Sequence, residues 1–217
     1  MPLSCLRPGT WLHSDVITVY IHQLNKDIPL DSLCLPPGKE CLSNLFGSLK
    51  VKKYKIAGRN FRDVTKWYIP LMNRAQDHYF WLLVDVSQLC ITAYDPYGMD
   101  RTAEMTSIDV KTITESPFRL ENFFKKPVQD DGFSCGVWQV AGIELVSKGQ
   151  TNLENVVSDA YALDPDAYKA KVHKFVHEWR IKLLACFLTS KSIGVQRPNF
   201  QRVTASPKRS VVRFWVS

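Results

Sequence analysis

Cys135 is the cysteine whose sequence surroundings favour covalent chemistry. A polar, acidic loop at 129–134 ends at this residue, and an apolar pattern with helical spacing begins there. At the start of a helix, unpaired N–H groups and the helix dipole stabilise a thiolate, the reactive form of the side chain. A single cysteine is more often a small core residue. Cys135 is therefore a candidate nucleophile only if a base lies close to it.

A base and a group that could orient it occur on two neighbouring predicted strands. His78 precedes an apolar stretch at 79–86, and Asp95 directly follows a second one at 89–94. The short polar connection between the two stretches predicts an antiparallel hairpin. In such a hairpin the start of one strand lies beside the end of the next. The sequence therefore predicts that His78 and Asp95 meet, which with Cys135 completes a Cys–His–Asp triad. In isolation, His78 reads as a loop histidine and Asp95 as an ordinary turn residue.

Gln129 is a candidate for stabilising the charge that develops during acyl transfer. Attack on a carbonyl requires hydrogen-bond donors aimed at the oxygen that becomes negative. Gln129 precedes Cys135 by six residues, so its side-chain N–H and the backbone N–H of Cys135 could serve together. The alternative is a solvated loop amide.

The elements that position these residues follow the order helices, strands, helices. Hydrophobic periodicity predicts helices over 11–24, 135–149 and 166–188, and strands over 67–71, 79–86 and 89–94. Ser14 is the expected N-cap of the first helix. Because the strands are grouped rather than alternating with helices, we expect an α+β fold with a mixed central sheet flanked by helices.

Composition predicts one folded domain and a short extension. The chain has 217 residues, of which 45% are hydrophobic, and a net charge of +7. Eight of its 28 basic residues lie from Trp179 onward, where there is no acidic residue, so the preceding part is close to neutral. We expect a catalytic domain over 1–192 and a basic, loosely ordered extension over 193–217.

The cysteines and the N-terminal sequence predict a reducing compartment. The six cysteines are scattered and form no Cys-x-x-Cys pair, a pattern that fits neither a disulfide framework nor a zinc cluster. The first residues do not have the basic flank and apolar core of a secretory signal. No stretch is apolar for the roughly 18 residues that a membrane helix needs. We therefore expect a nuclear or cytoplasmic protein without a membrane partner.

Three blocks of sequence resemble a known family. Residues 78–85 (His-Tyr-Phe-Trp-Leu-Leu-Val-Asp) and the following Tyr94-Asp95 resemble the His-Trp strand and Tyr-Asp turn of the ubiquitin-like-protein-specific cysteine proteases. These proteases are of the SUMO-protease or sentrin-specific type and belong to the adenain-like clan. Residues 129–137 (Gln-Asp-Asp-Gly-Phe-Ser-Cys-Gly-Val) resemble the block that holds the family's nucleophile. Residues 11–17 (Trp-Leu-His-Ser-Asp-Val-Ile) resemble its opening helix.

The resemblance implies a fold and a set of site residues. The fold would be papain-like, of the adenain-like kind. The triad would be His78, Asp95 and Cys135, with Gln129 as the oxyanion partner and no cofactor. In this family, an extended modifier C-terminus ending in Gly-Gly passes through a narrow aromatic tunnel, whose walls would here be Trp11 and Tyr79. Only glycine lets a backbone pass between two such rings.

The resemblance also implies a reaction and its partners. We expect cleavage after the Gly-Gly terminus of SUMO-like or related ubiquitin-like modifiers, in precursor processing or in deconjugation. The partners would be the modifier and its conjugates, and the enzyme a monomer. Tyr79 stands where the family usually has tryptophan, and His13 and Ser14 also depart from its opening block. These departures bear on which modifier is recognised.

Two other functions fit the same residues. Relatives in the clan use this triad as acetyltransferases that take acetyl groups from acetyl-CoA. A non-catalytic module that keeps only the modifier-binding groove is a third reading, against which the complete triad argues.

A histidine pair and the basic extension could indicate ligand binding, but neither predicts a dedicated site. His173 and His177 lie one helical turn apart but have no third ligand, so we expect a solvated helix face and no metal site. The basic extension could contact nucleic acid weakly, but we expect no dedicated nucleic-acid function.

Overall fold

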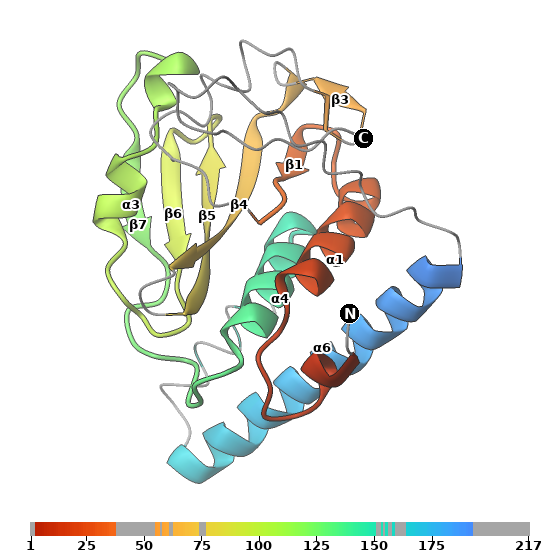
Figure 1. Cartoon of the computed structure of the whole chain (residues 1–217). Helices are drawn as coiled ribbons and strands as arrows, with labels where there is room; N and C mark the ends of the chain where they lie inside the picture. Colours follow the sequence, from red (N-terminus) through yellow and green to blue (C-terminus); the bar gives the residue numbers. More distant parts are fainter. Residues whose placement is uncertain are drawn as a thin grey trace, which may run out of the picture.

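A computed structural model describes most of the chain between residues 3 and 192 (Figure 1). The described residues are 3–37, 55–56, 58–60, 63–73, 77–150, 153, 155, 158 and 164–192. The helices are η1 (Leu3–Leu6), α1 (Ser14–Asp27), α3 (Thr102–Thr106), η4 (Val110–Thr112), α4 (Cys135–Ser147) and α6 (Pro165–Ser192). The strands are β1 (Ser32–Cys34), β2 (Lys55–Ile56), β3 (Arg59–Asn60), β4 (Lys66–Asn73), β5 (His78–Asp85), β6 (Cys90–Tyr94) and β7 (Arg119–Asn122).

The main sheet is mixed and has five strands in the order β1-β4-β5-β6-β7. Strands β4, β5 and β6 are antiparallel to one another, whereas β1 and β7 join the two edges in parallel. The expected α+β architecture with a mixed central sheet is therefore confirmed, and so is the hairpin that joins β5 to β6. The short pair β2 and β3 forms a separate antiparallel sheet.

Strand β5 is buried on both faces, which explains its uninterrupted apolar sequence. Successive side chains of a strand point to opposite faces. Tyr79 and Trp81 belong to the hydrophobic cluster on the side of the long helices. Phe80, Leu82 and Val84 belong to a second cluster on the other face, together with residues of β4 and β6.

Three long helices lie together on one side of the sheet (Figure 1). Helix α4 packs directly against β5 and also contacts α1 and α6, so it is apolar and buried around nearly its whole circumference. Its buried Glu144 accepts hydrogen bonds from Tyr20 of α1 and from Lys182 of α6. Lys148 forms a third contact with this carboxylate at 2.6 Å. Glu144 therefore links the three helices through a paired charge.

Several local predictions need correction. The N-cap of α1 is His13, whose ring accepts a hydrogen bond from the backbone N–H of Asp15, and not Ser14. The hairpin turn is longer than predicted and covers residues 86–89, with Leu89 at a φ of 48°. Asp85 stabilises this turn by accepting hydrogen bonds from Ser87 and Gln88.

The structure describes the last helix of the predicted domain but not the predicted extension that follows it. Helix α6 extends beyond its predicted range at both ends. The predicted basic extension, 193–217, lies outside the described residues. Among the helices that the structure does describe, none is long and apolar enough to cross a membrane.

The packing of α4 on β5 predicts the effect of one substitution. A side-chain carbon added at Gly142 would lie 2.8 Å from Nε1 of Trp81. The Trp81 ring is buried and stacks on Tyr94 at a centroid distance of 3.8 Å, so it cannot move aside. We expect Gly142→Ala to lower the free energy of unfolding by about 1–3 kcal/mol in denaturant titrations, the usual cost of overpacking.

Gly132 provides the matched control for this measurement. No atom lies within 4 Å of a carbon added there, so Gly132→Ala should change stability by less than about 0.5 kcal/mol. Equal stability of the two variants would contradict the close packing of α4 on β5.

Candidate active site

His78 and Asp95 meet at one end of the β5–β6 hairpin. In the register of the two strands Trp81 pairs with Tyr94, which places Asp95 opposite Phe80, and His78 lies two residues further along β5 on the same face of the sheet. His78 Nε2 is 2.8 Å from Asp95 Oδ1, and both side chains are almost fully buried. The second ring nitrogen, Nδ1, is buried and has no hydrogen-bond partner within the described part of the chain. The juxtaposition expected from the hairpin is confirmed.

The carboxylate of Asp95 is saturated with hydrogen bonds. Oδ1 accepts from His78 and, at 2.9 Å, from the backbone N–H of Tyr97. Oδ2 accepts a hydrogen bond from Arg101 Nε at 2.6 Å, and Nη2 of the same guanidinium forms an ion-pair contact with it at 2.5 Å. Burial opposes ionisation of this carboxyl, but these bonds and the positive charges beside it outweigh burial and hold the pKa of Asp95 below its ordinary value. Asp95 is therefore ionised at neutral pH.

Cys135 is the first residue of α4 and lies against the beginning of β5. The backbone N–H of Tyr79, the residue after His78, acts to lower the pKa of this thiol. The side chain is 1% exposed. Helix α4 covers this end of the hairpin because its apolar face packs on β5. The nucleophile, the base and the orienting carboxylate predicted from sequence thus come from the start of α4, the start of β5 and the end of β6.

The protonation of Cys135 differs from the sequence prediction. A helix start was expected to stabilise the thiolate. Burial instead raises the pKa of Cys135 to about 11, and the nearby charge of Asp131 acts in the same direction. The N–H groups of Tyr79, Gly136 and Cys135 itself oppose this shift without cancelling it. The thiol is protonated at neutral pH, so its reaction requires a proton acceptor.

Asp131 organises the loop that precedes Cys135. Its carboxylate accepts hydrogen bonds from the backbone N–H groups of Phe133 and Ser134 and from the Ser134 hydroxyl. Gln129 donates through Nε2 to the backbone oxygen of Asp131 at 2.6 Å and to the Tyr97 hydroxyl at 3.2 Å. The amide that was expected to face the oxyanion is thus engaged within its own loop, and its role stays a prediction.

Tyr97 joins the base to this loop. Its ring stacks on the His78 ring at a centroid distance of 4.6 Å, and its hydroxyl donates to the backbone oxygen of Asp131 at 2.7 Å. Sequence reasoning recognised the turn that contains Tyr97 but gave it no role. It also missed Arg101 and Asp131, which had no signal beyond a polar stretch and an acidic loop.

The two predicted tunnel walls differ in exposure. Trp11 is 47% exposed, whereas Tyr79 is 6% exposed. Residues 10–12 are held beside the site from two sides. Arg180 of α6 donates to the backbone oxygen of Thr10 at 2.6 Å, and a carbon added at Gly136 would lie 3.0 Å from Cβ of Leu12 and 3.5 Å from the Tyr79 ring. Glycine after Cys135 therefore permits close approach of both segments.

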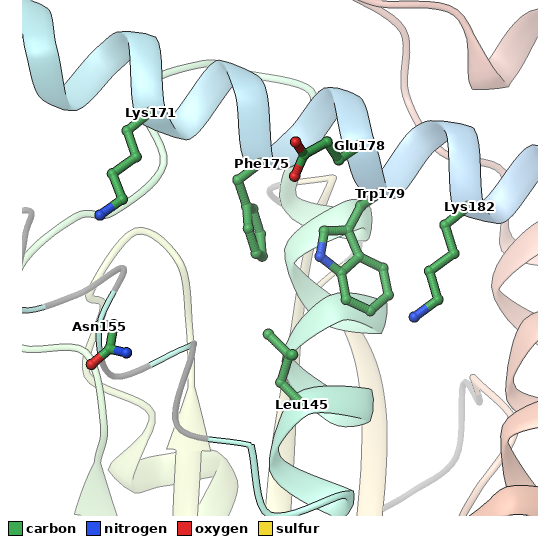
Figure 2. Close-up of a pocket in the computed structure, with 7 residues that line it drawn as sticks. All are labelled: Leu145, Asn155, Lys171, Phe175, Glu178, Trp179 and Lys182. Carbon is green, nitrogen blue, oxygen red and sulfur yellow. The ribbon is translucent and has the colours of Figure 1, made fainter.

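A cavity of about 430 Å³ lies apart from these residues, against α6 and the end of α4 (Figure 2). Its walls include apolar Leu145, Phe175 and Trp179 and charged Lys171, Glu178 and Lys182. None of the predicted site residues lines it. Because its walls contain neither a cysteine nor a histidine, the hydrogen-bonded pair of His78 and Asp95 is the stronger guide to the reactive centre.

The histidines of α6 do not gather ligands for a metal. His173 Nε2 is 3.5 Å from Asp130 Oδ2, and its side chain is 54% exposed. Over the described ranges, no group of three histidine, cysteine, aspartate or glutamate side chains could hold a metal ion.

Comparison with known sequences identifies proteases as relatives. The putative ubiquitin-like-specific protease 1B of Arabidopsis thaliana is 23% identical over 177 residues, which cover 68% of this chain and 50% of that protein. The ubiquitin-like-specific protease ESD4 of the same plant is 23% identical over 176 residues, which cover 68% of this chain and 34% of that protein. The chain therefore spans half or less of the length of these relatives. No protein-family profile matches it.

Comparison with solved structures gives the same fold. The C-terminal Ulp1 protease domain, in complex with Smt3, the yeast ortholog of SUMO, has a TM-score of 0.58 at 16% identity and covers 86% of this chain and 82% of its own. The Chlamydia trachomatis effector Cdu1, bound to ubiquitin, has a TM-score of 0.57 at 12% identity, covering 83% and 94%. The adenain-like fold and the resemblance predicted from the three sequence blocks are confirmed.

The buried, protonated thiol predicts how Cys135 reacts with a small alkylating agent. Its pKa near 11 means that the thiolate fraction grows about tenfold with each pH unit below that value. The alkylation rate of Cys135 by iodoacetamide, followed by mass spectrometry, should therefore rise steadily from pH 6 to pH 10. Cys135→Ser identifies the peptide concerned. A rate that is already maximal near pH 6 would instead indicate a thiolate–imidazolium pair.

Proposed function

We propose that this chain, which is related in sequence and fold to the ubiquitin-like-specific proteases, is a cysteine peptidase that cleaves after the C-terminal Gly-Gly of a ubiquitin-like modifier. The observation that carries the proposal is the His78–Asp95 hydrogen bond, made through Nε2, at the start of the strand whose next residue, Tyr79, influences the thiol of Cys135 through its backbone N–H. This bond leaves Nδ1 of a buried imidazole without a partner among the described residues. An ionised carboxylate that fixes one ring nitrogen prepares the other to accept a proton.

The reaction starts from a neutral thiol. Because burial keeps Cys135 protonated, proton transfer to His78 Nδ1 accompanies attack of the sulfur on the carbonyl carbon of the terminal glycine. The backbone N–H of Cys135, at the start of α4, is a donor for the resulting oxyanion. Gln129 can add a second donor if it exchanges one of its present acceptors, Asp131 or Tyr97, for that oxygen.

Two proton transfers complete the cycle. The imidazolium of His78 gives its proton to the departing amine as the C–N bond breaks, which leaves a thioester on Cys135. Water then attacks the thioester, again with His78 as base, and releases the modifier carboxylate and the thiol. The residues that act need no cofactor for these steps. The leaving amine is a peptide in precursor processing or a lysine side chain in deconjugation.

Trp11 and Tyr79 are the proposed walls of the channel for the Gly-Gly end. They lie on the two segments that flank Gly136, directly after the nucleophile. The exposed Trp11 ring offers a surface to an extended peptide, and Tyr79 forms the floor through its buried ring. Solved relatives of the fold are bound to Smt3 and to ubiquitin, which supports a modifier of this class as the partner.

A panel of ubiquitin-like proteins with a C-terminal electrophile tests the activity. The parent chain should form a covalent adduct with at least one member, Cys135→Ala with none, and His78→Gln should be slower by roughly 10³-fold or more. Cys5→Ala is the matched control, because Cys5 lies in η1 outside the site, and it should react like the parent. Folded parent protein that captures no member would contradict the proposal. So would a stable acetyl-enzyme formed from labelled acetyl-CoA without any cleavage.

The channel wall predicts a separate effect on substrate binding. Trp11 is half exposed and lies outside the core clusters, so Trp11→Ala should leave the unfolding temperature within a few degrees of the parent. Loss of its ring should slow modifier capture at least tenfold while leaving alkylation of Cys135 by iodoacetamide unchanged. Leu30→Ala, at an 80% exposed position, is the control and should affect neither. Equal capture by Trp11→Ala and the parent would contradict the channel.

A further inference from the structure

Arg101 is a buried cation at the site that the proposed reaction does not use directly. Its side chain is 4% exposed, although arginine is almost never fully buried without a partner. The residue lies after the Asp-Pro turn of β6 and immediately before α3. A guanidinium is always charged in proteins. A permanent positive charge is therefore enclosed next to the triad carboxylate.

The guanidinium of Arg101 binds the carboxylate of Asp95. Nε donates a hydrogen bond to Oδ2, and Nη2 forms an ion-pair contact with the same oxygen. This arrangement leaves Oδ1 to His78 and to the backbone N–H of Tyr97. With His78 and Tyr97 on Oδ1 and the guanidinium on Oδ2, the carboxylate has one favourable orientation, in which Oδ1 faces the imidazole. Arg101 thus fixes the carboxylate of Asp95 from the side opposite His78.

Arg101 is itself held from three sides. Its guanidinium carbon lies 4.2 Å above the ring of Phe80, which belongs to the same strand as His78. Nη1 donates to Glu104 of α3 at 2.9 Å, and the backbone N–H donates to the side-chain oxygen of Asn122 on β7 at 3.0 Å. A side chain held this way loses little further freedom when it binds the carboxylate.

We infer that Arg101 is a positioning residue, which keeps Asp95 ionised and oriented toward His78. The inference rests on the proposed function for its catalytic meaning. Arg101 touches neither the reacting atoms nor the substrate, so its effect must pass through Asp95. Among the described residues, the other charged or titratable groups near this centre are His78 and Tyr79 of β5, Tyr97 of the turn, Glu104 of α3, Asp131 of the loop before α4, and Cys135, the first residue of α4.

Removal of the Arg101 charge should move the acidic limit of activity to higher pH. A positive charge close to a carboxylate disfavours its protonation. Without that charge Asp95 takes up a proton at a higher pH, and a neutral carboxyl no longer stabilises the imidazolium. The acidic limb of the pH–rate profile should therefore move to higher pH. Loss of packing alone would lower the rate at every pH and leave the limb in place.

The test compares Arg101→Met and Arg101→Lys in two measurements. The first is the pH dependence of capture of an electrophilic ubiquitin-like protein that the parent accepts. The second needs no substrate and follows the carboxyl carbon of Asp95 by ¹³C NMR in protein with labelled aspartate, assigned with Asp95→Asn. In Arg101→Met, both midpoints should move up by about one pH unit or more. Arg101→Lys keeps the charge, so its midpoints should stay close to those of the parent.

Glu104→Gln is the control, because it removes the other carboxylate bound to Arg101 and leaves Asp95 in place. It should produce no upward shift. A folded Arg101→Met with parental midpoints in both measurements would overturn the inference. If this variant does not fold, Arg101→Gln, which also removes the charge, takes its place in the NMR titration: an upward shift of the Asp95 midpoint supports the inference, and a parental midpoint overturns it. Failure of the parent to capture any modifier would overturn the proposed function alone, since the NMR measurement is independent of substrate.

Discussion

Strand β5 occupies the centre of the sheet, and the burial of both its faces constrains every other part of the site. Its helix-side residues require a cover, which α4 provides. Its other residues pack with β4, β6 and α3. Because β5 is fixed in this way, its first residue, His78, has a defined position, and the hairpin register brings Asp95 to it. Helix α4 lies on β5 with its first residue, Cys135, near the same end of the strand. The reactive constellation is thus a consequence of core packing.

The buried charges of the site balance one another. Asp95 faces the Arg101 guanidinium on one side and His78 on the other, and Arg101 in turn binds Glu104. Enclosing an unpaired carboxylate would be costly, whereas a carboxylate that is hydrogen-bonded and paired with a guanidinium is stable in a low-dielectric surrounding. Cys135 has no comparable partner charge, and burial keeps it neutral. The site therefore holds a stable anion in Asp95 and a neutral nucleophile.

The sequence predicts those features that depend on local chain geometry. The meeting of His78 and Asp95 follows from a short connection between two apolar strands, and the start of α4 at Cys135 follows from helical periodicity. Arg101 was not predicted, since its stretch is polar and its burial depends on Phe80 and Asn122 from other strands. The edge strands β1 and β7 are too short for a visible alternation and join the sheet in parallel. The pKa of Cys135 was misjudged because helix position can be read from sequence, whereas desolvation cannot.

Arg180 links the placement of the Trp11 segment to a helix that is synthesised much later. Its guanidinium is 3% exposed and donates to the backbone oxygens of Cys5, Arg7 and Thr10, which are more than 160 residues away in the chain. During translation, the segment that carries Trp11 is made first but can take its place only after α6 has left the ribosome. Contacts between such distant residues close a long loop and form late in folding. The β5–β6 hairpin and the α4 helix that covers it are, by contrast, both made before α6, so His78 and Asp95 can be enclosed before the Trp11 segment is in place.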